Sequence, residues 1–132
     1  MTKLISAEDI YEKFKYLSNM RIESIIVCLL DRNYELDAHS EVGSGNERAS
    51  LINQEKLIKF LIEAPSNSHV VLIHNHPFDE AKPSEEDANM TSYIQSVCDL
   101  VGRKYMDHII IAKDEYYSFN SGVRTKYATA RS

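Results

Sequence analysis

Hydrophobic positions recur every three to four residues in three parts of the chain, which predicts three amphipathic helices. Just before the first of them, Ser6 and Asp9 form the pattern of a capping box. The turn-forming residues 65–68 end the second. The expected helices cover residues 7–18, residues 53 or 54 to 64, and residues 84 to about 105.

Between these helices, segments with the residue types and spacing of β-strands predict a sheet. Residues 24–30 are apolar after Ser24 and rich in Ile and Val, which indicates a buried strand. The expected strands cover residues 24–30, 34–42, 69–73, 107–112 and 116–119, with a flexible loop at 43–46 and a loop opening at 74–83. The resulting order, αββαβαββ, predicts an α/β (α+β) domain, in which helices pack against a mixed β-sheet.

Length and composition fit one domain and add a constraint on partners. The chain has 132 residues, of which 43% are hydrophobic and 27% are charged, as is ordinary for a globular protein. We expect a single domain over residues 1–122, followed by a basic, flexible tail over residues 123–132. The formal net charge of −5 argues against direct nucleic-acid binding, which needs a positively charged surface.

Two features of the chain predict a cytoplasmic protein that does not contact a membrane. No apolar run approaches the roughly 20 residues that span a bilayer, and the N-terminus lacks the pattern of a secretory signal. Cys28 and Cys98 do not form a CxxC pair, so we expect both to be buried, reduced thiols rather than metal ligands.

The segment with the most distinctive chemistry is His74-Asn75-His76-Pro77, followed after six residues by Ser84-Glu85-Glu86-Asp87. Side chains two positions apart on extended backbone point the same way, so His74 and His76 face one point. Asp87 falls in the first turn of the expected third helix, and the loop is long enough to return it to the two imidazoles. Two imidazoles and one carboxylate suit a zinc ion. Because three protein ligands leave a fourth position open, the pattern indicates a catalytic ion rather than a structural one.

Several of these residues also have a structural explanation. Ser84 is a good N-cap and Asp87 completes a capping box, so both can serve the helix alone. The two roles are compatible for Ser84, which can cap the helix and still line a site. The other histidines, His39, His69 and His108, are expected to be surface, edge or core residues rather than ligands.

The whole pattern, HxHP-x6-SxxD, resembles the JAMM motif of JAB/MPN+ metallopeptidases. Within that group the chain is similar to the RadC-like bacterial domains, because residues 107–111 and 117–119 match as well. The resemblance covers roughly residues 23–119 and implies a JAB fold, a curved sheet flanked by helices. It also implies one zinc ion per chain, held by His74, His76 and Asp87.

The resemblance implies roles for further residues. Glu23, at the start of the first strand, matches the family's general base. Ser84 matches the serine whose hydroxyl donates a hydrogen bond to the oxyanion. Glu55 is the next acidic candidate, but its place in the first turn of a helix already explains it. Phe78 and Asp79 stand where RadC-like proteins commonly carry Ser-Gly, and we expect Phe78 to pack against the substrate.

These roles together imply a zinc-dependent metallopeptidase or isopeptidase. Its substrate would be a peptide or isopeptide bond of a protein, such as a bond at the C-terminus of a ubiquitin-like modifier. One alternative is a zinc-binding RadC-like interaction module without turnover, linked to DNA repair or to defence against mobile elements. A metal-dependent nuclease is a weaker alternative, because the acidic net charge gives little support to a phosphate-binding surface.

Overall fold

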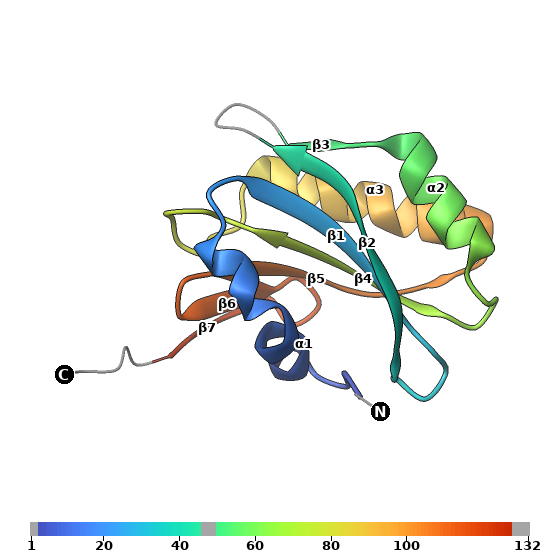
Figure 1. The fold of residues 1–132 in the computed structure, drawn as a ribbon, viewed down its shortest axis with the longest axis horizontal. Coiled ribbons are helices and arrows are strands. Elements are labelled where there is room, and N and C mark those ends of the chain that lie inside the picture. The colour runs from blue at the N-terminus through green and yellow to red at the C-terminus, as the bar shows by residue number, and fades with distance from the viewer. Residues whose placement is uncertain (1–2, 46–49, 128–132) are drawn as a thin grey trace.

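One β-sheet with helices on both of its faces organises the chain (Figure 1). The structure, a computed structural model, describes residues 3–45 and 50–127. In chain order the elements are α1 (Ala7–Phe14), the 3-10 helix η1 (Lys15–Asn19), β1 (Glu23–Leu30), β2 (Leu36–Gly45), β3 (Ser50–Ile52), α2 (Gln54–Glu63), β4 (His69–Asn75), α3 (Glu85–Val101), β5 (Lys104–Ala112), β6 (Glu115–Ser118) and β7 (Val123–Lys126). No helix within those two ranges is long and apolar enough to cross a membrane.

β4 lies at the centre of the seven-stranded sheet, whose order is β3-β2-β1-β4-β5-β6-β7. It is antiparallel to β1 and parallel to β5, while the other neighbouring pairs are antiparallel. Parallel neighbours need a crossover connection, and α3 provides it between β4 and β5. The predicted mixed α/β fold is therefore confirmed, and the end of β4 and the start of α3 lie at the same edge of the sheet (Figure 1).

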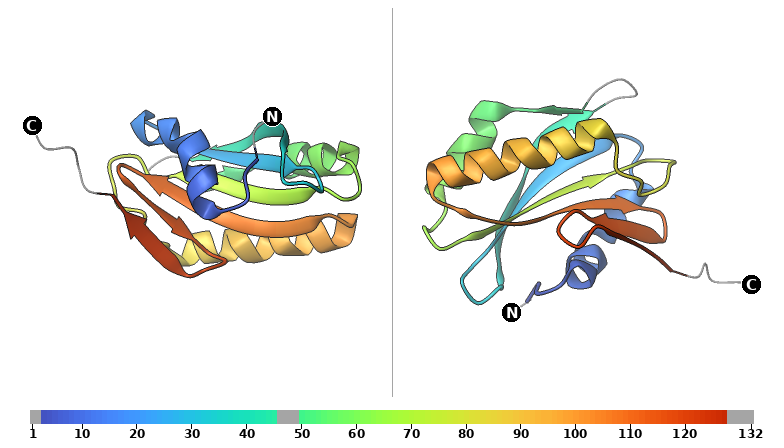
Figure 2. Two further views of the ribbon diagram at one scale, coloured as in Figure 1. Left: turned by 90° about the horizontal axis from the view of Figure 1, so that it is seen from below. Right: turned by 180° about the vertical axis from the view of Figure 1, so that it is seen from behind.

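The two larger hydrophobic clusters of the described residues cover the two faces of the sheet, with α1 on one face and α3 on the other (Figure 2). β1 contributes to both cores, because successive side chains of a strand point to opposite faces. Its residues on the α1 side are Ile26, Cys28 and Leu30, and those on the side of α2 and α3 are Ile25, Val27 and Leu29. This double burial explains the continuous apolar run. Cys28 and Cys98 are buried free thiols, as predicted.

The predicted flexible loop at residues 43–46 is wrong for its first three residues. Residues 43–45 belong to β2, where they pair with residues 23–25 of β1 on one side and with β3 on the other. Pairing on both sides supplies backbone hydrogen bonds that a glycine-rich composition does not predict. Asn46 lies outside the described residues, and β3 was not predicted at all.

The boundaries predicted for two later elements are also wrong. Residues 123–126 of the predicted tail form β7, which pairs antiparallel with β6, whereas residues 128–132 lie outside the described residues. The third helix ends at Val101 rather than near Tyr105, because Gly102 adopts a left-handed conformation (φ 73°) that stops it. β5 therefore begins earlier than predicted, at Lys104.

Candidate metal centre

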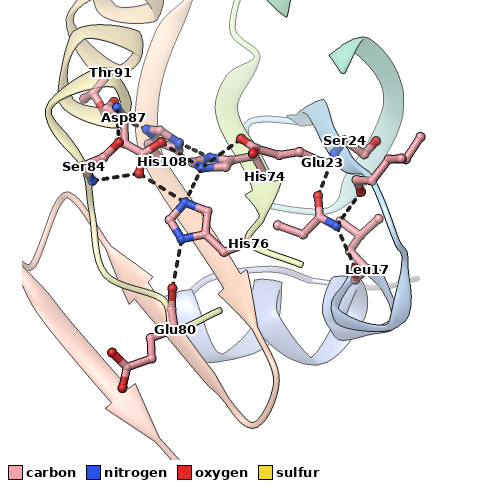
Figure 3. A network of polar contacts seen from close by, with 12 residues as sticks. Leu17, Glu23, Ser24, His74, His76, Glu80, Ser84, Asp87, Thr91 and His108 are labelled. Atoms are coloured by element: carbon pink, nitrogen blue, oxygen red, sulfur yellow. Dashed lines mark hydrogen bonds and ion pairs between the residues drawn. The ribbon is translucent and has the colours of Figure 1, made fainter. Parts of the chain in front are cut away.

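His74, His76 and Asp87 come from the end of β4, the residue that follows it and the first turn of α3. β4 continues through Asn75, so the loop opens later than predicted. Extended backbone there places both imidazoles on one side, and the connection to α3 brings Asp87 to them (Figure 3). The structure thus brings together the three residues that the sequence predicted as ligands.

The ligand atoms of these three side chains converge on one point. The Nε2 atoms of His74 and His76 lie 3.1 Å apart. His74 Nε2 is 3.0 Å from Asp87 Oδ1, and His76 Nε2 is 3.2 Å from Asp87 Oδ2. The donor atoms all lie within 4.8 Å of one another, and His74 and Asp87 are 0% and 4% exposed. Two imidazole nitrogens and a carboxylate, this close together and this buried, fit a metal ion.

Asp87 also begins α3. Its Oδ2 accepts a hydrogen bond from the Ser84 backbone N–H at 2.8 Å, and its own N–H donates to Ser84 Oγ at 3.1 Å. This capping box satisfies two backbone donors at the start of the helix. The structural and the metal-binding explanations of SxxD therefore hold together, since Asp87 caps the helix while its carboxylate faces the two imidazoles.

The carboxylate of Asp87 gives the cluster a negative charge, which favours a bound cation. Burial alone raises the pKa of Asp87, but the adjacent imidazoles of His74 and His76 and a hydrogen bond from the Ser84 N–H hold that pKa well below its usual range. Burial lowers the pKa of His76, yet contacts with Asp87 and with the Glu80 carbonyl raise it overall. Asp87 is therefore ionised at neutral pH and supplies negative charge to the site.

Glu23 opens β1 beside this cluster. Its Oε1 lies 3.8 Å from His74 Nε2, and its side chain is 18% exposed. The buried Asn75 makes three hydrogen bonds to the backbone near Glu23. Its partners are the Ser24 N–H (2.6 Å), the Ile22 carbonyl (3.0 Å) and the Leu17 carbonyl (2.9 Å). The motif contains Asn75, but its partners lie 51 to 58 residues away in the sequence, so nothing local indicates this role.

His108 of β5 contacts one of the ligands, a contact that the sequence did not predict. The side chain is fully buried, and its Nε2 lies 2.8 Å from His74 Nδ1 (Figure 3). Burial, followed by the proximity of His74, lowers the pKa of His108 well below its usual value, so the ring is neutral. His108 is a core residue, as expected, and lies outside the three-residue ligand cluster. Its hydrogen bond depends on the β4–β5 register, which a local pattern does not reveal.

The other candidates that the sequence set aside make structural contacts. His39 packs edge-on against Phe14, with 5.4 Å between ring centroids, and His69 stacks on Tyr34 at 4.4 Å. Glu55 lies in the first turn of α2, as predicted. None of these residues belongs to the metal-ligand cluster found in the described part of the chain.

The loop after His76 forms the outer side of the site. His76 Nδ1 lies 2.9 Å from the Glu80 carbonyl, and the Glu80 side chain pairs with Arg124 of β7 at 3.2 Å. Arg124 also pairs with Glu115 at 2.6 Å. Phe78 in this loop is 87% exposed and has a φ of 62°, a left-handed conformation that is strained for a bulky residue. Its predicted contact with a substrate stays a prediction.

A largely buried His-His-Asp cluster at the end of the central strand of a mixed sheet, with a glutamate on the neighbouring strand, defines a candidate metal-binding domain of the JAB type. The chain belongs to the RadC-like JAB domain family, whose family model matches residues 4–125.

The relatives of this chain are longer proteins. It is 31% identical over 121 residues to a UPF0758 protein of Coprothermobacter proteolyticus and 33% identical over 118 residues to one of Aquifex aeolicus. A UPF0758 protein of Chlorobaculum tepidum is 29% identical over 118 residues. These alignments cover 87% to 89% of this chain but 51% to 53% of the relatives. The chain therefore spans about half the length of the curated relatives that it matches.

Proposed function

We propose that this chain is a zinc-dependent hydrolase of peptide or isopeptide bonds. The observation that carries the proposal is the convergence of His74, His76 and Asp87, with Glu23 Oε1 3.8 Å from His74 Nε2. Membership of the RadC-like JAB family supports it, because JAB domains include metallopeptidases.

His74, His76 and Asp87 would hold the ion, and three protein ligands leave a coordination position open, as catalytic sites require. When bound, zinc supplies Lewis acidity, which lowers the pKa of a water molecule toward about 7 and polarises the scissile carbonyl. Among the three ligands only Asp87 contributes a negative charge, since imidazoles bind metals in their neutral form.

Glu23 acts as the general base and then as the general acid. In the reaction the oxygen of water bonds to the carbonyl carbon and the C–N bond breaks. The Glu23 carboxylate accepts one proton from the attacking water and passes it to the leaving nitrogen. Its position beside His74 and its partial exposure suit this transfer between the site and the substrate. Asn75 holds the adjacent backbone in place through its three hydrogen bonds.

Ser84 stabilises the negative charge that develops on the carbonyl oxygen. The capping box uses Ser84 Oγ as an acceptor, which leaves the hydroxyl hydrogen able to donate to an oxyanion. The start of α3 adds its partial positive charge at the same place. A single donor of this kind contributes on the order of 3 kcal/mol in another hydrolase.

The proposed substrate is an extended segment of a protein, such as the C-terminus of a ubiquitin-like modifier. An extended segment presents its carbonyl groups without unfolding of the rest of the substrate. Phe78 is 87% exposed and lies two residues beyond His76, so it offers an apolar contact beside the scissile bond. Such a contact would act on substrate binding rather than on the chemical step.

Elemental analysis combined with cleavage assays tests the proposal. Protein purified without added zinc is compared with His76→Ala, Glu23→Gln and, as a matched control, Glu55→Gln on a panel of peptide and isopeptide substrates. We expect about one zinc per chain in the wild type, none in His76→Ala, and full zinc without cleavage in Glu23→Gln. Glu55→Gln should keep both zinc and activity, because Glu55 lies on α2 outside the cluster.

Two outcomes would contradict this function. Cleavage by Glu23→Gln at the wild-type rate would exclude Glu23 as the general base. If the wild type binds one zinc per chain but cleaves no substrate, the alternative of a zinc-binding module without turnover is favoured.

A further inference from the structure

A continuous series of hydrogen-bonding contacts, called the relay below, runs from Nδ1 of His74 to the backbone of Asp87 (Figure 3). His74 Nδ1 lies 2.8 Å from His108 Nε2. His108 Nδ1 lies 2.6 Å from Thr91 Oγ1, and Thr91 Oγ1 lies 3.2 Å from the Asp87 carbonyl oxygen. The relay therefore begins and ends at residues of the proposed ligand cluster, and its two intermediate side chains, His108 and Thr91, come from outside that cluster.

Counting the available hydrogens shows in which direction the groups of the relay donate to one another. If His74 Nδ1 carries its proton, it donates to His108 Nε2, His108 Nδ1–H donates to Thr91 Oγ1, and the Thr91 hydroxyl donates to the Asp87 carbonyl. Every contact then has one donor and one acceptor. In the reverse direction, the single hydroxyl hydrogen of Thr91 points at His108 Nδ1, and its contact with the Asp87 carbonyl is lost. Among these three contacts, the first direction therefore keeps one more hydrogen bond than the reverse.

We propose that His108 and Thr91 are positioning residues, which hold His74 in the tautomer with its proton on Nδ1 and so leave Nε2 free to bind a metal. This inference rests on the metal site of the proposed function. It matters because, without the relay, His74 Nε2–H could donate to Asp87 Oδ1, which is 3.0 Å away. A proton on His74 Nε2 would prevent that nitrogen from binding a metal ion.

The ring of His108 is held on its other sides as well. Phe119 stacks on it with 4.6 Å between centroids and 10° between ring planes. The neighbouring Asp107 accepts hydrogen bonds from the Asn120 N–H at 2.9 Å and the Ser118 hydroxyl at 2.6 Å, which fixes the turn that carries Phe119. A fully buried imidazole held in this way keeps one orientation, as a partner of a metal ligand requires.

Nitrogen-15 NMR of the metal-free protein reads the tautomer of His74 directly, with no dependence on activity. We expect the proton of wild-type His74 on Nδ1. Thr91→Val keeps the shape of the side chain but removes the acceptor for His108 Nδ1–H, so the proton of His108 should move to Nε2 and that of His74 to its own Nε2. Thr91→Ser keeps the hydroxyl and should keep the wild-type tautomer. A wild-type His74 protonated on Nε2 would overturn the proposal.

Zinc affinity, measured by competition with a chromophoric chelator, gives the second readout. Loss of an outer partner of a metal ligand typically weakens binding about 10–100-fold, and we expect this for Thr91→Val and His108→Phe. His108→Gln, whose amide oxygen can accept from His74 Nδ1–H, should recover part of the loss. Ser96→Ala removes a similar hydroxyl-to-carbonyl contact of α3, at 3.0 Å to Ser92, and should leave the affinity unchanged.

The outcomes separate this inference from the proposed function. Zinc binding by the wild type without any cleavage would remove the proposed reaction but leave the relay to be decided by tautomer and affinity. Equal zinc affinity in the wild type, Thr91→Val and His108→Phe would overturn the relay even if the wild type is an active hydrolase. Because Thr91→Val is isosteric, it keeps the test decisive if His108→Phe fails to fold, which circular dichroism reports.

Discussion

The two histidines of the candidate metal centre are supported in different ways. His74 is fully buried, and its Nδ1 contacts the buried side chain of His108 in the middle of the sheet. His76 is partly exposed, and its Nδ1 contacts the backbone carbonyl of Glu80 in a surface loop. The inner histidine therefore depends on particular side chains, whereas the outer one depends on the course of the backbone.

This difference separates two kinds of sensitivity to mutation. A backbone carbonyl survives any side-chain replacement that leaves the loop in place, so the outer support should tolerate substitution. The contact that supports His74 is lost when the buried side chain of His108 is replaced, and His74 Nδ1 is then left without a partner. Five measurements test this contrast, in decreasing order of the change that we expect.

Replacing each histidine by alanine should abolish metal binding in both cases but should affect stability unequally. His74→Ala leaves His108 Nε2 without its partner and opens a cavity, so we expect a loss of about 2–3 kcal/mol in the free energy of unfolding. His76→Ala should cost less than about 1 kcal/mol, because the side chain is partly exposed. Urea denaturation of the metal-free variants measures the difference, and equal losses would refute the contrast.

Asn75→Ala should lower both stability and turnover while zinc stays bound. The change leaves one buried N–H and two carbonyls without their side-chain partner, at an expected cost of about 2–3 kcal/mol. The backbone that carries Glu23 also loses its restraint, so kcat should fall at an unchanged zinc content. Asn67→Ala, at an exposed turn, is the control and should change the unfolding free energy by less than about 0.5 kcal/mol. Normal kcat in Asn75→Ala would show that Asn75 does not position Glu23.

Zinc affinity should fall as the pH is lowered, and the fall should begin above pH 6.5. A protonated imidazole cannot bind zinc, and the pKa of His76 in the metal-free protein is raised above its ordinary value of about 6.5. Below that raised pKa, His76 alone weakens binding about tenfold per pH unit. Chelator competition between pH 8 and pH 6 measures the slope. An affinity that does not change over this interval would contradict the pKa shift of the outer histidine.

Arg124→Met should have a smaller effect, because it acts only on the outer loop. The variant loses the ion pairs with Glu80 and Glu115, so we expect a loss of about 1–2 kcal/mol in stability. Zinc affinity should fall by less than about tenfold, since the partner of His76 Nδ1 is the Glu80 backbone carbonyl. The exposed Lys126 on the same strand provides the control Lys126→Met. If Arg124→Met lowers zinc affinity more than Thr91→Val does, the outer loop matters more for zinc binding than the buried contacts of His74, contrary to our expectation.

Phe78→Gly should leave stability nearly unchanged. Glycine adopts a φ of 62° without strain, and the exposed ring gives up little packing, so the unfolding free energy should change by less than about 1 kcal/mol. If Phe78 contacts the substrate, KM rises while kcat stays constant. Phe78→Asn, which also tolerates this conformation, should behave in the same way. An unchanged KM in both variants would remove Phe78 from the substrate site.

The ligand cluster could be predicted from the sequence because local rules place its members. Alternation along extended backbone aligns His74 with His76, and the capping box puts Asp87 at the start of a helix. The strand that begins at Glu23 was also predictable, since burial on both faces leaves a continuous apolar run.

The supporting residues could not be found in this way. The contacts of His108 and Asn75 depend on which strands become neighbours, and the local pattern around them contains no trace of that pairing. The two edge strands, β3 and β7, were missed for a related reason. β3 has three residues and β7 is mostly polar, so neither has a clear strand pattern of its own, and β2 takes glycines into the sheet through partners on both sides.

The capping box at Ser84 and Asp87 affects how this motif is conserved during evolution. A related chain without the proposed reaction would still need both residues to begin α3, so selection for folding alone would retain them. Glu23 takes no part in that cap. Among related chains, SxxD alone would therefore be weak evidence of the proposed reaction, and a glutamate at the start of the first strand would be the better marker of it.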